Sequence, residues 1–117
     1  MSINAELNLS DDVKQLIVKD KYDEGADAVF LLGDSAVSLK DIPDNSVKLI
    51  ITSPPYNLNK AYESNKTLTE YFAMIEPVIE QLIRVLAPNG SLCWQVGNYV
   101  DKGEVYPLDM FYYPYFK

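Results

Sequence analysis

The chain has 117 residues, 48% of them hydrophobic, and a net charge of −7; this composition suits one folded domain or part of one and excludes disordered and fibrous proteins. No apolar run approaches the roughly 20 residues that span a bilayer, and the first ten residues lack a basic-then-apolar signal pattern. The single cysteine, Cys93, excludes an internal disulfide. We therefore expect a cytoplasmic protein that is not bound to a membrane.

The residues that are absent or scarce also limit the chemistry. There are no histidines, which excludes His-based metal sites and Ser-His or Cys-His nucleophiles, and we expect no metal. A free-standing DNA-binding protein usually has a basic patch, because Lys and Arg displace the counterions of the phosphates. The acidic balance of this chain is not typical of one.

The sequence of the first half of the chain predicts short helices and strands that alternate. Residues 11–19 open with two acidic residues and predict a short helix, followed by a charged loop to Asp27. The continuous apolar run 28–32 predicts a strand buried on both faces. Residues 35–42 predict a short helix, and Pro43-Asp44-Asn45-Ser46 a turn before a second buried strand at 47–52.

In the second half, apolar residues recur every three or four positions over 67–86 and predict a helix, with Thr67 and Glu70 as a capping box. Pro77 lies inside it, so we expect a kink or two abutting helices. Four further elements are expected: a Pro-Asn-Gly turn at 88–90, a third strand at 91–96, a loop at 97–105, and a helix at 107–113 with Pro107 as its first residue.

The alternation of strands and helices predicts an α/β fold with a doubly wound, mostly parallel sheet. Ligands of such sheets bind beyond the carboxyl ends of the strands. Gly33-Asp34 follows the strand 28–32, and Ser53–Tyr56 follows the strand 47–52. We expect these two segments to converge on one edge of the sheet.

The segment Ser53-Pro54-Pro55-Tyr56 has the chemistry to grip an aromatic amine. The Ser53 hydroxyl and the Pro54 carbonyl are acceptors, and two prolines fix the backbone and donate no N–H. Acceptors placed where the N–H bonds of an exocyclic amine will point favour a tetrahedral, nucleophilic nitrogen. Tyr56 offers a flat face on which an extruded base can stack. The plainer interpretation is a rigid exit from a strand, with its tyrosine packed on the surface.

Four segments decide between these interpretations: LLGDS at 31–35, DIPDNSVKLIITSPPYN at 41–57, RVLAPNGSL at 84–92 and YPLD at 106–109. Together, and in this order, they resemble the DNA amino-methyltransferases that modify N4 of cytosine or N6 of adenine. The resemblance is to the members whose catalytic region precedes the cofactor-binding region. It extends over roughly residues 28 to 117 and implies a Rossmann-like methyltransferase sheet.

The resemblance implies roles for single residues. Ser53 and the Pro54 carbonyl would hold the amine, Pro55 would shape the loop, and Tyr56 would stack on the base. Gly33 and Asp34 would lie near the methyl donor, S-adenosylmethionine, although Asp34 suits a helix N-cap equally well.

Asn57 and Lys60 match a polar stretch that in relatives reaches the substrate. A solvated loop is the better interpretation for Lys60, as it is for Tyr62. Trp94 is expected in the core, whereas the sequence does not decide whether Gln95 and Asn98 line the pocket. The aromatic tail 106–116 lacks interleaved basic residues and is expected to bury itself rather than to stack on nucleic acid.

The chain departs from the family in one respect. Relatives carry a target-recognition segment and then a Phe-x-Gly-x-Gly-type motif for the methyl donor, and neither occurs here. We therefore expect an amino-terminal piece, with a helix and loop at 1–27 and an incomplete catalytic part at 28–117. The missing carboxyl-terminal region, or a second chain, would supply most of the cofactor site and the basic cleft for DNA.

Serine at the first motif position favours cytosine N4 over adenine N6, because aspartate predominates in adenine-specific relatives. An alternative of another class is an inactive remnant that serves as an interaction module for a partner chain. An enzyme of the same fold that methylates an RNA or protein amine is a further alternative.

Overall fold

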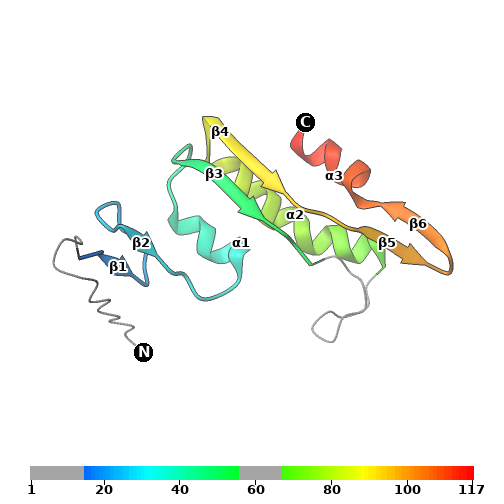
Figure 1. Cartoon of the computed structure of the whole chain (residues 1–117), viewed down its shortest axis with the longest axis horizontal. Coiled ribbons are helices and arrows are strands. Elements are labelled where there is room, and N and C mark those ends of the chain that lie inside the picture. The colour runs from blue at the N-terminus through cyan, green and yellow to red at the C-terminus, as the bar shows by residue number, and fades with distance from the viewer. Residues whose placement is uncertain (1–14, 56–66) are drawn as a thin grey trace. The chain divides into compact units, whose positions relative to one another are not determined.

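The computed structural model describes residues 15–55 and 67–117, which form two compact units with their boundary after Ile42. Each unit is described by itself. The chain contains both helices and strands, and the described strands pair as three two-stranded sheets, two of them parallel and one antiparallel (Figure 1). Among the described residues, the helices lack the length and the hydrophobicity of a membrane-spanning segment. The division predicted between residues 27 and 28 stays a prediction.

The first unit contains a short parallel strand pair and a short helix. Strand β1 (Val18–Lys19) pairs with β2 (Ala28–Val29). Helix α1 (Ser35–Ser38) continues into the 3₁₀ turn η1 (Leu39–Asp41), which confirms the helical segment predicted at 35–42.

Two predictions for this unit are wrong. Residues 15–19 are not helical, because Ile17 is held in an extended segment by Asp27: the Ile17 amide donates to the Asp27 carboxylate at 2.9 Å, and the Asp27 amide donates to the Ile17 carbonyl at 2.8 Å. The strand expected at 28–32 ends at Val29, because its partner β1 is only two residues long. Phe30 and Leu32, expected to be buried, are 69% and 103% exposed.

The second unit is built on a parallel pair of longer strands. Its elements are β3 (Val47–Thr52), α2 (Leu68–Val85), β4 (Leu86–Trp94), β5 (Asn98–Asp101), β6 (Glu104–Pro107) and α3 (Leu108–Phe116). β3 has the predicted bounds and pairs in parallel with β4, with Thr52 opposite Trp94. Only Ile50 of β3 is fully buried, however, so the strand is not covered on both faces as expected.

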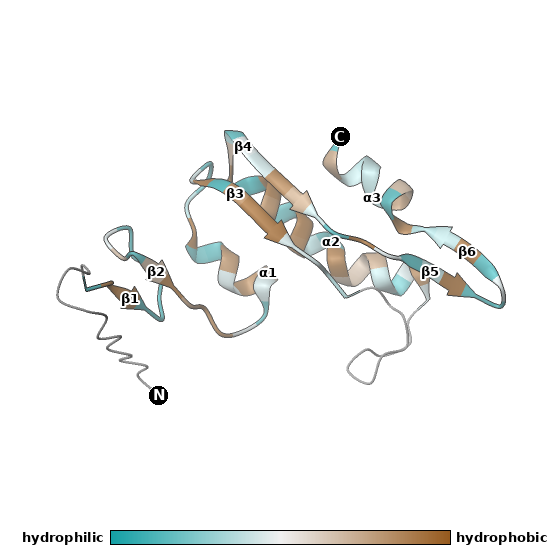
Figure 2. Cartoon of the chain, in the orientation of Figure 1, coloured by the Kyte–Doolittle hydropathy of each residue, from teal (hydrophilic) through white to brown (hydrophobic). Residues whose placement is uncertain are grey.

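The predicted helix is confirmed as α2, which begins at the predicted capping box: the Glu70 amide donates to the Thr67 hydroxyl, and the Thr67 amide donates to the Glu70 carboxylate. Pro77 lies inside one continuous helix, so two abutting helices are excluded. Buried Ile75 and Ile79 lie on either side of it, and their packing offsets the hydrogen bond that a proline removes. Figure 2 shows hydrophobic residues along α2 and on β3.

The helix passes directly into β4, so the turn predicted at 88–90 is instead part of that strand. The amides of Asn45 and Ser46 donate to the carbonyls of Arg84 and Val85, at 3.0 and 2.9 Å. The turn at 43–46, which precedes β3, thus supplies hydrogen-bond donors to the last carbonyls of α2, and no glycine cap is needed at the end of this helix. The residues around Gly90 form an irregularity in the pairing of β4 with β3.

The prediction of a loop at 97–105 is wrong, because an antiparallel hairpin of β5 and β6 occupies this segment. Lys102 and Gly103 both have positive φ, 49° and 87°, which is the backbone of a type I′ hairpin turn. Val100 and Val105 face each other across it. Pro107 is the N-cap of α3 rather than its first residue.

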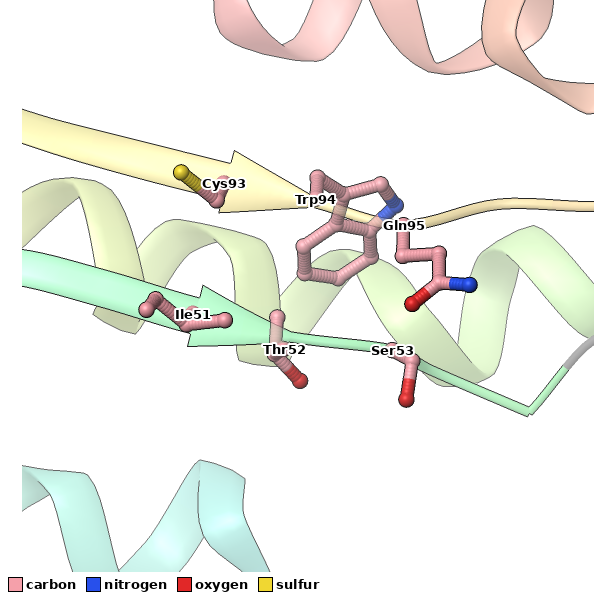
Figure 3. A pocket seen from close by; sticks show the side chains of 6 residues that line it. All are labelled: Ile51, Thr52, Ser53, Cys93, Trp94 and Gln95. Carbon is pink, nitrogen blue, oxygen red and sulfur yellow. The ribbon is translucent and has the colours of Figure 1, made fainter.

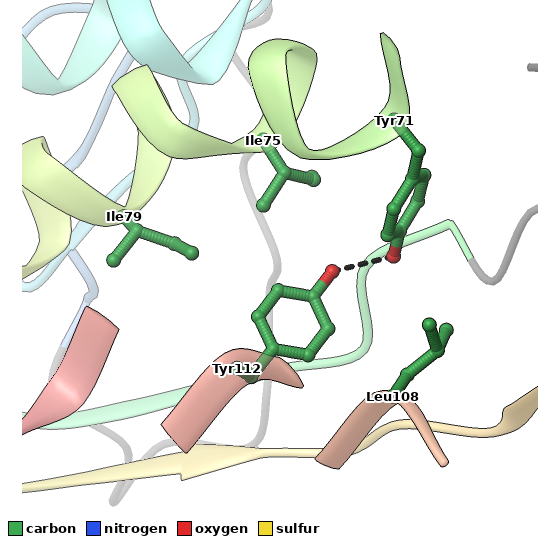
Figure 4. Packing of buried hydrophobic residues seen from close by; sticks show 5 residues of the cluster. All are labelled: Tyr71, Ile75, Ile79, Leu108 and Tyr112. Atoms are coloured by element: carbon green, nitrogen blue, oxygen red, sulfur yellow. Dashed lines mark hydrogen bonds between the residues drawn. The ribbon is translucent and has the colours of Figure 1, made fainter. Parts of the chain in front are cut away.

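Helix α3 closes the hydrophobic core of this unit. The buried cluster joins Tyr71, Ile75 and Ile79 of α2 to Leu108 and Tyr112 of α3 (Figure 4). Seven partly buried residues pack against it: Leu68, Phe72, Trp94, Val96, Tyr99, Tyr115 and Phe116. The structure confirms that Trp94 packs on the core. The aromatic tail buries itself only in part: Leu108 and Tyr112 are buried, whereas Phe111 and Tyr113 are 42% and 66% exposed.

Replacing Ile79, 1% exposed, by alanine is expected to lower the free energy of unfolding by about 2–5 kcal/mol, because it opens a cavity in this cluster. Ile83, one turn further on and 46% exposed, is the matched control, and Ile83→Ala is expected to cost about 1 kcal/mol or less. Urea denaturation measures both. Equal losses would show that the cluster is not the core.

Candidate functional site

An open hollow of about 690 Å³ lies where β3 and β4 end. It is lined by Ile51, Thr52, Ser53, Cys93, Trp94 and Gln95 (Figure 3). Both strands are parallel and finish at this edge, which is where α/β sheets place their ligands. The hollow lies at the predicted end of the strand 47–52 and contains the first residue of the Ser-Pro-Pro segment.

The Ser-Pro-Pro segment leaves the sheet with two of its acceptors unpaired among the described residues. The Gln95 amide donates to the Thr52 carbonyl at 2.9 Å, which extends the pairing of the strands by one bond. Ser53 is exposed, whereas Pro54 is buried. Among the described residues, neither the Ser53 hydroxyl nor the Pro54 carbonyl takes part in a hydrogen bond. The exposed Ser53 hydroxyl is therefore available to a ligand with N–H donors, and the Pro54 carbonyl is an acceptor without a partner in the described part of the chain.

A tyrosine from the core holds the end of this segment. The Tyr71 hydroxyl donates to the Pro55 carbonyl at 2.6 Å and also contacts the Tyr112 hydroxyl at 2.5 Å (Figure 4). A carbonyl only accepts, and a tyrosine has one O–H. Tyr71 therefore donates to Pro55, and Tyr112 donates to Tyr71.

Tyr112 remains protonated in this arrangement. Its burial raises the pKa of the phenol far above its ordinary value, and the hydrogen bond with Tyr71 raises this pKa further, while the Trp94 indole acts in the opposite direction. Because a phenol ordinarily ionises near pH 10, the upward shift keeps Tyr112 a neutral donor throughout the physiological range.

The residues at the end of β4 take different positions. The Gln95 side chain extends toward Ser53 and lines the hollow (Figure 3). Asn98 lies in the hairpin, on β5, and is not among the residues lining the hollow. The Trp94 indole packs against Tyr112 at 5.2 Å between ring centroids, and its Nε1 is buried without a normal hydrogen bond among the described residues.

Gly33 and Asp34 lie in the other unit, ahead of α1. Gly33 has φ +147°, which disfavours any residue with a side chain. The Asp34 carboxylate accepts from the Ala36 amide at 2.8 Å, so Asp34 is the N-cap of α1. Its second oxygen has no partner among the described residues. That oxygen can accept from a ligand with hydroxyl or amino donors.

Four residues singled out in the sequence lie outside the described residues: Tyr56, Asn57, Lys60 and Tyr62. Asp34 and Ser53 belong to different units, so their convergence on one edge stays a prediction. Among the described residues, no group of three or more Cys, Asp or Glu is placed to bind a metal ion.

Sequence reasoning missed Tyr71 and Tyr112 as residues of the site. The helical periodicity placed Tyr71 on the buried face of α2, and Tyr112 was part of an apolar tail. The signal was the hydroxyl itself, because a buried tyrosine usually finds a hydrogen-bond partner. The identity of that partner, the Pro55 carbonyl, depends on tertiary packing.

The comparison with known proteins identifies the family. A family model for DNA methylases matches residues 47–113, which include β3, the Ser-Pro-Pro segment, α2 and most of α3. The chain belongs to this DNA methylase family. The resemblance found in the sequence is thereby confirmed.

The relatives of the chain are bacterial modification enzymes. The Type II methyltransferase M.BglII of Bacillus subtilis is 51% identical over 86 residues, 73% of this chain and 24% of that protein. M.ScaI of Streptomyces caespitosus is 33% identical over 100 residues, 83% of this chain and 32% of that protein. The chain thus spans about a quarter to a third of the length of these relatives.

A solved structure is similar as well. The crystal structure of TTHA0409, a proposed DNA modification methylase of Thermus thermophilus, matches with a TM-score of 0.58 and 25% identity. The match covers 86% of this chain and 38% of that one. This chain and the matching part of TTHA0409 therefore have a similar fold.

Replacing Asp34 by alanine is expected to lower the free energy of unfolding by about 1 kcal/mol, because the cap of α1 is lost. Asp34→Asn is the matched control: its amide oxygen still accepts from Ala36, so the loss is expected to be about 0.5 kcal/mol or less. Thermal unfolding followed by circular dichroism compares the two variants. Equal losses would show that the charge, and not the cap, stabilises this unit.

Proposed function

We propose that this chain carries the base-gripping part of a site-specific DNA methyltransferase. The complete enzyme would transfer a methyl group from S-adenosylmethionine to the exocyclic amine of a base extruded from the duplex. The observation that supports this proposal is the exposed Ser53 hydroxyl in a hollow at the end of β3, followed at once by the Pro54 carbonyl, which has no hydrogen-bond partner among the described residues. A doubly wound, Rossmann-like sheet in the complete domain is part of the proposal.

The acceptors address the central difficulty of the reaction. The lone pair of an exocyclic amine is delocalised into the base, so the amine is a poor nucleophile until its nitrogen becomes tetrahedral. Ser53 and Pro54 would accept the two N–H bonds in that geometry and stabilise the developing positive charge. Because Pro54 and Pro55 fix φ near −65°, the acceptors need little reorganisation during the reaction.

The remaining residues of the motif have supporting roles in this proposal. Tyr56 would stack on the extruded base, a contact worth about 1–3 kcal/mol in single-strand complexes. Pro55 would set the shape of the loop. Asn57 and Lys60 would reach the substrate from the polar stretch that follows.

Gly33 and Asp34 are the candidates for holding the cofactor. The second oxygen of the Asp34 carboxylate would accept a hydroxyl or amino donor, and Gly33 would allow a close approach of the backbone. When bound, S-adenosylmethionine supplies an electrophilic methyl group. This chain would orient the amine so that its two N–H bonds point to the acceptors and its lone pair points to the methyl group.

The proposed target is cytosine N4, with adenine N6 as the alternative. Serine at position 53 supports cytosine, because aspartate predominates at this position in adenine-specific relatives. Both side chains present an acceptor oxygen to an amine, so the mechanism is the same for either base.

DNA would be bound by the complete enzyme. The chain is acidic, with a net charge of −7, and phosphate binding requires basic residues. It also spans only about a quarter of M.BglII. We therefore assign the DNA cleft and most of the cofactor site to a carboxyl-terminal region or to a second chain. An inactive remnant that docks on a partner chain is the alternative of another class.

Ser53→Ala in the complete gene product is expected to lower kcat for methyl transfer to duplex DNA by at least about tenfold, because one acceptor for the amine is lost. Ser91→Ala is the matched control, since Ser91 is an exposed serine of β4 outside the hollow. Transfer of tritiated methyl groups to DNA measures both. Unchanged kcat in Ser53→Ala would contradict the proposed role of the loop.

The methylated base is identified by mass spectrometry of nucleosides from DNA treated with the complete gene product. We expect N4-methylcytosine. N6-methyladenine would support the alternative target, and methylation of RNA or protein alone would contradict the DNA substrate. No methylation of any of these would favour the interaction module.

A further inference from the structure

We propose that Tyr71 and Tyr112 are positioning residues of the methyltransferase, joined in a hydrogen-bond relay that holds the Ser53-Pro54 acceptors in place. The relay runs from the Tyr112 hydroxyl to the Tyr71 hydroxyl and from there to the Pro55 carbonyl. This inference rests on the proposed function, because it gives the relay its purpose in the grip on the base.

The backbone of the acceptor segment is fixed at both of its ends. Before it, the Thr52 carbonyl accepts from the Gln95 amide at 2.9 Å, as the last bond between β3 and β4. After it, the Pro55 carbonyl accepts from Tyr71 at 2.6 Å. Ser53 and Pro54 are the only two residues between these anchors, and they are the two residues that present acceptors to the amine.

The prolines make the second anchor necessary. Neither Pro54 nor Pro55 has an N–H, so the segment cannot continue the ladder of the sheet. Their φ angles are fixed, but their ψ angles are not. A hydrogen bond to the Pro55 carbonyl restricts the remaining rotations, because a carbonyl moves as part of its planar peptide group.

The relay is well placed to act as a rigid support. Tyr71 and Tyr112 are 1% and 2% exposed and belong to the buried cluster with Ile75, Ile79 and Leu108. Their rings pack edge to face, and Phe72 and Trp94 pack against them. The hydroxyls therefore have little freedom to move, and the hydrogen bond between them is buried.

The relay also has a fixed direction. The only O–H of Tyr71 goes to the Pro55 carbonyl, so Tyr112 supplies the proton between the two phenols. Loss of the Tyr71 hydroxyl releases the carbonyl, whereas loss of the Tyr112 hydroxyl leaves the bond to Pro55 intact. Tyr71 is therefore expected to matter more for the reaction than Tyr112.

The test compares three Tyr→Phe variants of the complete gene product, each of which removes only a hydroxyl. Tyr71→Phe is expected to lower kcat for methyl transfer about tenfold or more, since a small displacement of reacting groups is costly, with KM for DNA and for S-adenosylmethionine changed less than about twofold. Tyr112→Phe is expected to lower kcat about two- to threefold. Tyr113→Phe, on the same helix and 66% exposed, is the control and is expected to leave kcat unchanged.

A double-mutant cycle with Ser53→Ala separates positioning from a purely structural role. If Tyr71 acts through the acceptor segment, Tyr71→Phe costs less in the Ser53→Ala background than in the wild type. Equal fold-losses in both backgrounds, an effect on KM alone, or an unchanged kcat in Tyr71→Phe would each overturn the relay. Full activity of Ser53→Ala by itself would instead overturn the proposed function, so the two failures are distinguishable.

Discussion

The hydrogen bond from Tyr71 to the Pro55 carbonyl connects the hydrophobic core with the Ser-Pro-Pro segment. It ends a chain of contacts that begins in the packing of α3 on α2, passes through the hydroxyl of Tyr112, and reaches the backbone at the end of β3. A strand that leaves a sheet through two prolines loses the ladder that held it straight. In this protein the core replaces that ladder with a buried phenol, and the geometry of the acceptors depends on it.

The segment combines a restricted backbone with two acceptors that have no hydrogen-bond partner in the part of the chain that the structure describes. The prolines and the two tyrosines restrict the backbone, while the Ser53 hydroxyl and the Pro54 carbonyl have no partner among the described residues. Catalysis by fixed dipoles requires such a combination, since acceptors that must first be reoriented lose part of their effect. Because the chain belongs to the DNA methylase family, we relate this geometry to the methylation of DNA. The chain has a net charge of −7, whereas phosphate contacts require basic residues, and for this reason the proposal gives those contacts to another part of the enzyme.

The elements that could be predicted from the sequence are those with strong local signals. β3 and α2 follow an apolar run and a helical periodicity with a capping box, and both are confirmed. The hairpin was missed because Lys102-Gly103 is a weaker turn signal than Asn-Gly. The direct passage from α2 into β4 depends on the amides of Asn45 and Ser46, which are distant in sequence. For the site, the motif located Ser53 and Pro54, but no local pattern indicates that the hydroxyl of Tyr71 reaches Pro55.

We propose that Ser53 and Pro54 hold the exocyclic amine of an extruded base, and a crystal structure of the complete gene product with its duplex DNA and an unreactive analogue of S-adenosylmethionine would show whether they do. We expect the amine nitrogen within about 3.2 Å of both the Ser53 hydroxyl and the Pro54 carbonyl, with Tyr71 still bonded to Pro55. A base that is bound elsewhere, or an amine that contacts neither acceptor, would contradict it.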